Sequence, residues 1–275
     1  MNDLLKRSLT GVIYVVAILA GTIIHPLVFV VVFGALLFLT QHEFYKLTGN
    51  TAIVPQRISG QIFGILLFAV SFCIAYRILP PKVALLFIPL FILVFVFELF
   101  RMNTKPLQNS AVTLLGLIYV AVPFCLLNFI VFPGFQLKAT FYPWILTGIF
   151  FIIWIYDSVA YLVGSMFGKH KIHERISPKK SWEGLIGGAI IAVIMGILNA
   201  VFFQVLSMFS WIIIALIIVI FGTLGDLFES KIKRDLEVKD SGSMLPGHGG
   251  FLDRLDSLLF AVPVIYIWLI IAGNL

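Results

Sequence analysis

Residues 184–206 read GLIGGAIIAVIMGILNAVFFQVL, a run of 23 residues without a charged side chain. A helix of roughly 20 apolar residues spans the hydrocarbon core of a bilayer, so this stretch predicts a transmembrane helix. The composition extends that prediction to the whole chain, because 61% of its 275 residues are hydrophobic and only 12% are charged. Soluble domains carry about 25% charged residues, and the composition therefore excludes a soluble globular protein.

Apolar runs bounded by charges, prolines or polar clusters predict nine spans in an all-α, polytopic membrane protein. Their expected bounds are 9–24, 26–40, 58–79, 82–100, 110–132, 142–164, 184–206, 209–224 and 255–273. The first two runs are short and meet at His25-Pro26, which fits either a helical hairpin or one long kinked span. We expect the N-terminal run to stay in the mature protein, because no small-residue cleavage site precedes the second span.

Basic residues predict how these spans are threaded, because Lys and Arg are retained on the cytoplasmic side. Of the 19 Lys and Arg, 16 fall in the N-terminal segment and the even-numbered loops, and three fall in the other loops. We therefore expect a cytoplasmic N-terminus and an outside C-terminus. Residues 1–275 are expected to form one membrane-embedded domain, with polar cytoplasmic active-site segments at about 165–183 and 225–254.

Several classes of protein are excluded or disfavoured by the same sequence. Cys73 and Cys125 both lie inside apolar runs, which excludes a disulfide framework and a cysteine-built metal site. The net charge is +6, but no basic region with interleaved aromatic residues is present, so nucleic acid is not an expected partner. No internal repeat with paired broken helices is found, which weakens a secondary-transporter interpretation.

Acidic residues concentrate near the C-terminal end, where seven of 13 fall within a window of 31 residues. They are Asp226, Glu229, Asp235, Glu237, Asp240, Asp253 and Asp256. Asp235 and Glu237 fit a solvated loop whose charges pair at helical spacing. Asp226, Asp253 and Asp256 instead lie where the chain enters or leaves an apolar run, and carboxylates there are costly unless they are paired or bound to metal.

The spacing of these three acids favours a cation site. Asp253 and Asp256 are at i and i+3, which places both on one face of a helix, although the pair alone also fits a helix start, where the dipole favours negative charge. With Asp226 they make the oxygen-rich kind of site that Mg²⁺ prefers, completed by substrate phosphates. Neighbouring cations and the glycine-rich stretch 246–250 would hold anionic oxygens. The pattern predicts metal-assisted phosphoryl chemistry on a membrane substrate.

The same window carries a resemblance to a known family. Residues 230–234 read SKIKR, residues 239–240 read KD, and residues 248–256 read HGGFLDRLD. This arrangement resembles the signature of the phosphatidate cytidylyltransferases, also called CDP-diacylglycerol synthases. No departure from the family pattern is found across these 27 positions.

A second stretch resembles the same family. Asp157 is a lone carboxylate in an apolar span, and residues 177–184 read SPKKSWEG. Taken alone, an acid in a span fits a functional site or a buried acid bonded to Tyr or Ser neighbours. The basic stretch alone also fits a cytoplasmic anchor before a helix capped by Ser181. The two stretches cover a little over a fifth of the chain, and the first 150 residues match only in being hydrophobic.

The resemblance implies that CTP and phosphatidic acid give CDP-diacylglycerol and pyrophosphate. We expect Asp226, Asp253 and Asp256 to hold Mg²⁺, and a second cation, divalent or potassium, to share the site. The other candidates are Lys233, Arg234, Lys239, Asp240, His248 and Asp157 as catalytic residues, and Lys179, Lys180, Ser177, Ser230, Gly249, Gly250 and Arg254 as substrate-binding residues. A homodimer is carried over from the family, and the compact chain fits a bacterial inner membrane.

Other functions are separable by experiment. A CTP-dependent lipid kinase would release CDP, whereas a cytidylyltransferase releases pyrophosphate. An ion or phosphate transporter would place its acids near the membrane midplane on broken helices, whereas these acids crowd one face. A non-catalytic scaffold leaves the dense signature unexplained. Glu98 and Arg101, at i and i+3, are expected to form a structural pair at a helix end.

Overall fold

The computed structural model describes residues 3–49, 52–102, 104–133, 140–245, 247 and 249–274, with side chains from Ser8 onward. The chain folds as two compact units. The first unit comprises Met1–Phe141 and Val238–Leu255, and the second comprises Tyr142–Glu237 and Asp256–Leu275. Each unit is described by itself below.

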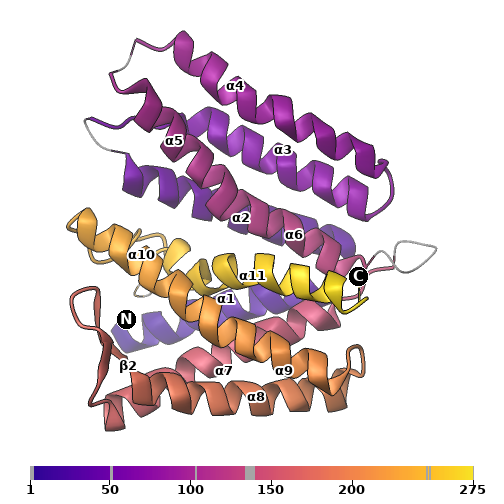
Figure 1. Cartoon of the computed structure of the whole chain (residues 1–275), viewed down its shortest axis with the longest axis vertical. Coiled ribbons are helices and arrows are strands. Elements are labelled where there is room, and N and C mark those ends of the chain that lie inside the picture. Colours follow the sequence, from indigo (N-terminus) through magenta and orange to yellow (C-terminus); the bar gives the residue numbers. More distant parts are fainter. Residues whose placement is uncertain are drawn as a thin grey trace. The chain divides into compact units, whose positions relative to one another are not determined.

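The first unit is a bundle of apolar helices. Its elements are α1 (Asp3–Ile23), α2 (Pro26–Thr48), α3 (Arg57–Ala75), the 3₁₀ turn η1 (Pro81–Leu86), α4 (Phe87–Leu99), α5 (Pro106–Gly116), the π-helical turn η2 (Leu117–Ala121) and α6 (Val122–Val131). In Figure 1, α5 leads into α6, and both run alongside α2 and α3. Fully buried aromatic side chains such as Phe33, Tyr45 and Phe68 fill the interior of this unit.

The second unit is built around a long helical hairpin. Its elements are α7 (Trp144–Phe167), β1 (Lys171–His173), β2 (Ser177–Ser181), α8 (Trp182–Phe203), α9 (Met208–Ile217), the π-helical turn η3 (Ile218–Gly222), α10 (Thr223–Asp235) and most of α11 (Leu252–Ile271). In Figure 1, α7 and α8 lie side by side, and α9 runs on into α10.

Glycines set the close packing of α7 against α8. A Cβ atom added to Gly184 would lie 2.6 Å from the carbonyl oxygen of Ala160 and 3.1 Å from the Cα atom of Gly164. One at Gly188 would lie 2.9 Å from the ring of Tyr156. Small residues let helix backbones approach each other within membranes, so this pair of helices depends on the missing side chains.

The all-α membrane fold predicted from composition is confirmed. Eight helices in the described chain are long and apolar enough to cross a bilayer, and Ser8–Ile23 forms a further, shorter apolar helix. The expected break at His25-Pro26 separates two helices, because His25 is extended and its ring accepts a hydrogen bond from the backbone N–H of Leu27. The count of nine spans and the cytoplasmic N-terminus stay predictions.

Two polar segments differ from the expected loops. Residues 165–183 contain the antiparallel pair of β1 and β2, in which Lys171 faces Ser181. The segment 225–254 begins as helix, because the last transmembrane helix before it continues through α10 to Asp235. The predicted cap is confirmed, since the hydroxyl of Ser181 accepts a hydrogen bond from the backbone N–H of Gly184.

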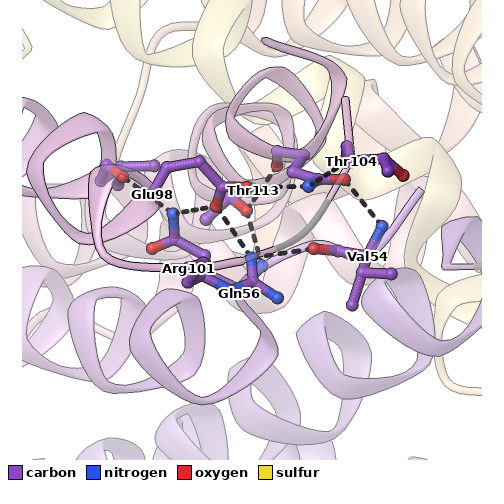
Figure 2. A network of polar contacts seen from close by, with 8 residues as sticks. Val54, Gln56, Glu98, Arg101, Thr104 and Thr113 are labelled. Atoms are coloured by element: carbon purple, nitrogen blue, oxygen red, sulfur yellow. Dashed lines mark hydrogen bonds and ion pairs between the residues drawn. The ribbon is translucent and has the colours of Figure 1, made fainter. Parts of the chain in front are cut away.

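The predicted pairing of Glu98 with Arg101 is confirmed and belongs to a larger buried network (Figure 2). The Glu98 carboxylate accepts hydrogen bonds from Arg101 at 2.8 Å, from Gln56 at 2.8 Å and from Asn109 at 2.7 Å. The backbone N–H of Gln56 in turn donates to the hydroxyl of Thr113. These contacts tie the start of α3 to α4 and α5, so the role of Glu98 is structural.

Candidate active site

Asp226 lies on α10 and links this helix to the β hairpin. Its carboxylate pairs with Nζ of Lys180 on β2 at 2.6 Å and accepts a hydrogen bond from the hydroxyl of Ser230 at 3.2 Å. The Asp226 and Lys180 side chains are 35% and 24% exposed, so both stay accessible to a ligand. Lys180 of the stretch 177–184 and Ser230 of the stretch 230–256 therefore bind the same carboxylate.

Glu229 lies one turn further along α10 and is the buried acid of this helix. The residue is 1% exposed and pairs with Lys233 at 3.1 Å. Charged side chains are almost never fully buried unless they are paired. The sequence prediction gave Glu229 no role, although its spacing of three residues from Asp226 and four from Lys233 was visible.

Asp256 lies on α11 and is 8% exposed. The two helices touch here, because a Cβ atom on Gly225 would lie 2.5 Å from the carbonyl oxygen of Asp256, and the hydroxyl of Ser257 donates to the carbonyl of Gly222 at 3.3 Å. The carboxylate of Asp256 accepts a hydrogen bond from the backbone N–H of Ser257 at 2.6 Å. It therefore has one local donor inside a largely apolar surrounding.

Asp157 brings α7 into the same region. The hydroxyl of its neighbour Tyr156 bonds to the hydroxyl of Thr223 at the start of α10. Asp256 interacts electrostatically with three further carboxylates, those of Asp157, Asp226 and Glu229. We call these four residues the acid cluster. Three of its members are predicted site residues, and the fold gathers them from α7, α10 and α11.

Asp253 has a different environment, in the first unit. Its carboxylate accepts hydrogen bonds from the backbone N–H groups of Gly250 at 2.8 Å and of Ser241 at 3.1 Å. Gly249 has φ +85°, and a Cβ atom there would lie 2.6 Å from the same carboxylate. Asp253 therefore ties Ser241 to Gly250. Its predicted role as a metal ligand stays a prediction.

The basic candidates of the second unit lie on α10 and the β hairpin. Lys233 is bound to Glu229, and Nε of Arg234 donates to the carbonyl of Ile176 at 3.4 Å. Exposed positions are held by Lys179, Lys239, Asp240 and Arg254. Ser177 begins β2, and Gly249 and Gly250 precede α11. His248 lies outside the described residues.

The donor atoms of the acid cluster suit Mg²⁺, which prefers oxygen ligands and is usually bound through one or two carboxylates, several waters and substrate phosphates. Four carboxylates share this region, and two lysines, Lys180 and Lys233, form ion pairs with them. In the described part of the chain, no three His, Cys, Asp or Glu side chains are arranged around one metal position. The cluster therefore fits a cation that takes most of its ligands from substrate and water.

Similarity to known proteins extends over nearly the whole chain. Residues 5–272 match the profile of a family described as the Cytidylyltransferase family. A protein of Bacillus subtilis (strain 168), named phosphatidate cytidylyltransferase, is 32% identical over 273 residues, which cover 97% of both chains.

Two staphylococcal proteins carry the same name. The one from Staphylococcus saprophyticus subsp. saprophyticus is 38% identical over 169 residues, and the one from Staphylococcus aureus (strain COL) is 50% identical over 123 residues. These matched segments cover 61% and 44% of this chain. They span only 62% and 47% of the length of the two relatives.

Proposed function

Because this chain belongs to the cytidylyltransferase family, we propose that it transfers a cytidylyl group from CTP to phosphatidic acid, giving CDP-diacylglycerol and pyrophosphate. The name of the Bacillus subtilis relative supports this reaction, since that alignment covers 97% of both chains. The observation that carries the proposal is the Asp226 carboxylate, because it binds Lys180 of the stretch 177–184 and Ser230 of the stretch 230–256.

The nucleophile is a phosphate oxygen of phosphatidic acid. A phosphate monoester has a second pKa near 6 and is mostly dianionic at pH 7, so the reaction needs no protein base. This oxygen attacks the α-phosphorus of CTP, a new P–O bond forms, and the bond to the β-phosphate oxygen breaks as pyrophosphate leaves. The main obstacle is repulsion between two anions, which an active site overcomes by positioning and electrostatics.

Cationic side chains of the chain would reduce the repulsion between the two anionic substrates. Lys180 and Lys233 already contact acidic residues of α10, and each is placed to exchange that partner for a phosphate oxygen. Arg234, Lys239 and Lys179 supply further positive charge to the triphosphate and the lipid phosphate. Substrate binding is also proposed for Ser177, Ser230, Gly249, Gly250 and Arg254. Asp240 and His248 would orient the substrates or the ligands of the metal.

The acidic side chains are proposed to hold Mg²⁺. Asp226, Asp253 and Asp256 would hold Mg²⁺ and a second cation, divalent or potassium, as a metal pair, and Asp157 would complete the polar surroundings. When bound, such ions neutralise the charge that develops on transferred and leaving phosphate oxygens. The chain's own part is to align these carboxylates at the membrane surface.

The chain is an integral membrane protein, and we place its active site on the cytoplasmic side of a bacterial inner membrane. The distribution of 16 of 19 basic residues supports that orientation. The lipid tails would stay among the helices while the phosphate reaches the surface where CTP is dissolved. A homodimer is proposed by analogy with the family.

The decisive experiment incubates purified protein with α-labelled CTP, phosphatidic acid and Mg²⁺. We expect a labelled liponucleotide and unlabelled pyrophosphate, and neither without Mg²⁺. Release of labelled CDP instead would identify a lipid kinase. Phosphate uptake into proteoliposomes without nucleotide, in a protein that makes no liponucleotide, would identify a transporter.

A further inference from the structure

Glu43 is a buried acid near the C-terminal end of α2, and none of the sequence motifs includes it. The residue is 1% exposed. Its Oε2 atom accepts a hydrogen bond from the backbone N–H of Leu252 at 3.0 Å, and the backbone N–H of Phe251 also donates to the carboxylate. Glu43 thus binds the start of α11 from a position 209 residues earlier in the chain.

We propose that Glu43 is a positioning residue for cytidylyl transfer, which holds residues 241–242 and 250–252 at the start of α11 so that Asp253 meets the reacting phosphates. This inference rests on the proposed function. The first N–H groups of a helix have no partner within it, and they attract negative charge. A carboxylate from α2 satisfies the N–H of Leu252, the first of these groups, together with that of Phe251 just before the helix, and fixes where α11 begins.

Gly242 and Gly250 lie directly against the Glu43 carboxylate. A Cβ atom on Gly242 would lie 2.5 Å from its Oε1 atom, and one on Gly250 would collide with its Oε2 atom and with the hydroxyl of Ser241. Both glycines therefore place backbone directly against the acid. Asp253 accepts hydrogen bonds from the backbone N–H groups of Ser241 and Gly250. Both acids therefore contact this part of the chain.

The Glu43 site is not optimised for stability alone. In the described part of the chain, Glu43 Oε1 and Ser241 Oγ are buried without a hydrogen-bond partner. Buried polar atoms without a partner are unfavourable. The first unit contains a contrasting case in Glu98, whose carboxylate is bound by the side chains of Gln56, Arg101 and Asn109 (Figure 2).

This contrast supplies a matched control. We would compare Glu43→Gln and Glu43→Ala with Glu98→Gln in purified full-length protein, measuring kcat, KM for CTP, the Mg²⁺ concentration for half-activation and Tm. We expect Glu43→Gln to lower kcat or raise the half-activating Mg²⁺ concentration by about 10- to 100-fold, the usual effect of removing a residue that orients a ligand. Glu98→Gln should lower Tm and leave both kinetic quantities near wild type.

Hydrogen–deuterium exchange gives a readout that needs no substrate. Backbone amides of residues 240–252 should exchange faster in Glu43→Gln than in wild type. Their exchange rates in Glu98→Gln should equal those of wild type. Because this measurement does not depend on turnover, an inactive wild-type protein would refute the proposed function while the role of Glu43 in holding the segment is still tested.

Two results would overturn the proposal. One is a Glu43→Gln protein with wild-type kcat, Mg²⁺ dependence and amide exchange. The other is a Glu43→Gln protein that loses only thermal stability, as Glu98→Gln does, or that no longer folds, because the residue would then be structural.

Discussion

At the scale of single residues, the acid cluster is a concentration of negative charge in the second unit. Asp256 is 8% exposed and interacts electrostatically with Asp157, Asp226 and Glu229. Gathering like charges is unfavourable, most of all at the buried members Asp256 and Glu229. Such a group persists where a cation or a cationic ligand joins it, and this is the physical reason to look for the reaction there.

Replacing one acid of the cluster at a time tests its role. Asp226→Asn and Asp256→Asn keep the shape of the side chain and remove its charge, so we expect the rate of CDP-diacylglycerol formation to fall by about 100- to 1,000-fold. Asp235→Asn is the control, because Asp235 is exposed and pairs with Lys231 one turn earlier on the same helix. Near-normal turnover in both cluster variants would refute the metal role.

Lys180 offers a second test at this scale. We expect Lys180→Met to raise KM for CTP by about 10- to 100-fold, because a charge-assisted contact to phosphate is lost. Lys231→Met removes a lysine of a helical ion pair whose Nζ binds Asp235 at 2.9 Å, and its KM should be unchanged. Equal kinetics for the two variants would exclude Lys180 from substrate binding.

At the scale of elements, hydrophobic length predicts the helices well. The run 142–164 became α7 (Trp144–Phe167), and the run 255–273 became α11 (Leu252–Ile271). The run 209–224 was predicted too short, because α10 continues as an amphipathic helix whose charges hid it from a search for apolar segments. The hairpin of β1 and β2 was missed, since its Pro and Lys residues have low strand propensity.

The packing of α7 against α8 predicts which glycine cannot be replaced. In Gly184→Ala, the new methyl group would meet the backbone of Ala160 at 2.6 Å, and we expect Tm in detergent to fall by several degrees. Gly34→Ala on α2 is the control, because its nearest neighbour is a ring atom of Phe68 at 3.6 Å. A Tm for Gly184→Ala equal to that of Gly34→Ala would contradict this packing argument.

Residues of the candidate site could be predicted only where their chemical type is unusual for the surrounding sequence. Asp157, Asp226 and Asp256 stood out because each is an acid beside or inside an apolar run. Glu43 did not, because its partners Phe251 and Leu252 are more than 200 residues away and use backbone groups common to every residue. Tertiary contacts of this kind carry no signal in the sequence pattern.

At the scale of the whole molecule, the orientation in the membrane is the open prediction. In a background without Cys73 and Cys125, Lys171→Cys lies in the hairpin of β1 and β2, and Lys82→Cys lies in η1. A cytoplasmic active site requires an impermeant maleimide to label Lys171→Cys only in inverted vesicles and Lys82→Cys only in right-side-out vesicles. The reverse labelling pattern would place the site on the opposite side.

The number of residues in the π-helical turn η3, between α9 and α10, sets the direction in which the side chains of α10 point. The turn lies four residues before Asp226, and π-bulges often occur at functional sites. Each residue of an α-helix advances the azimuth by about 100°. Deleting one residue from Ile218–Gly222 would therefore rotate the side chains of α10 by about 100° around the helix axis without removing any acid. We expect insertions and deletions here to reduce activity far more than substitutions do.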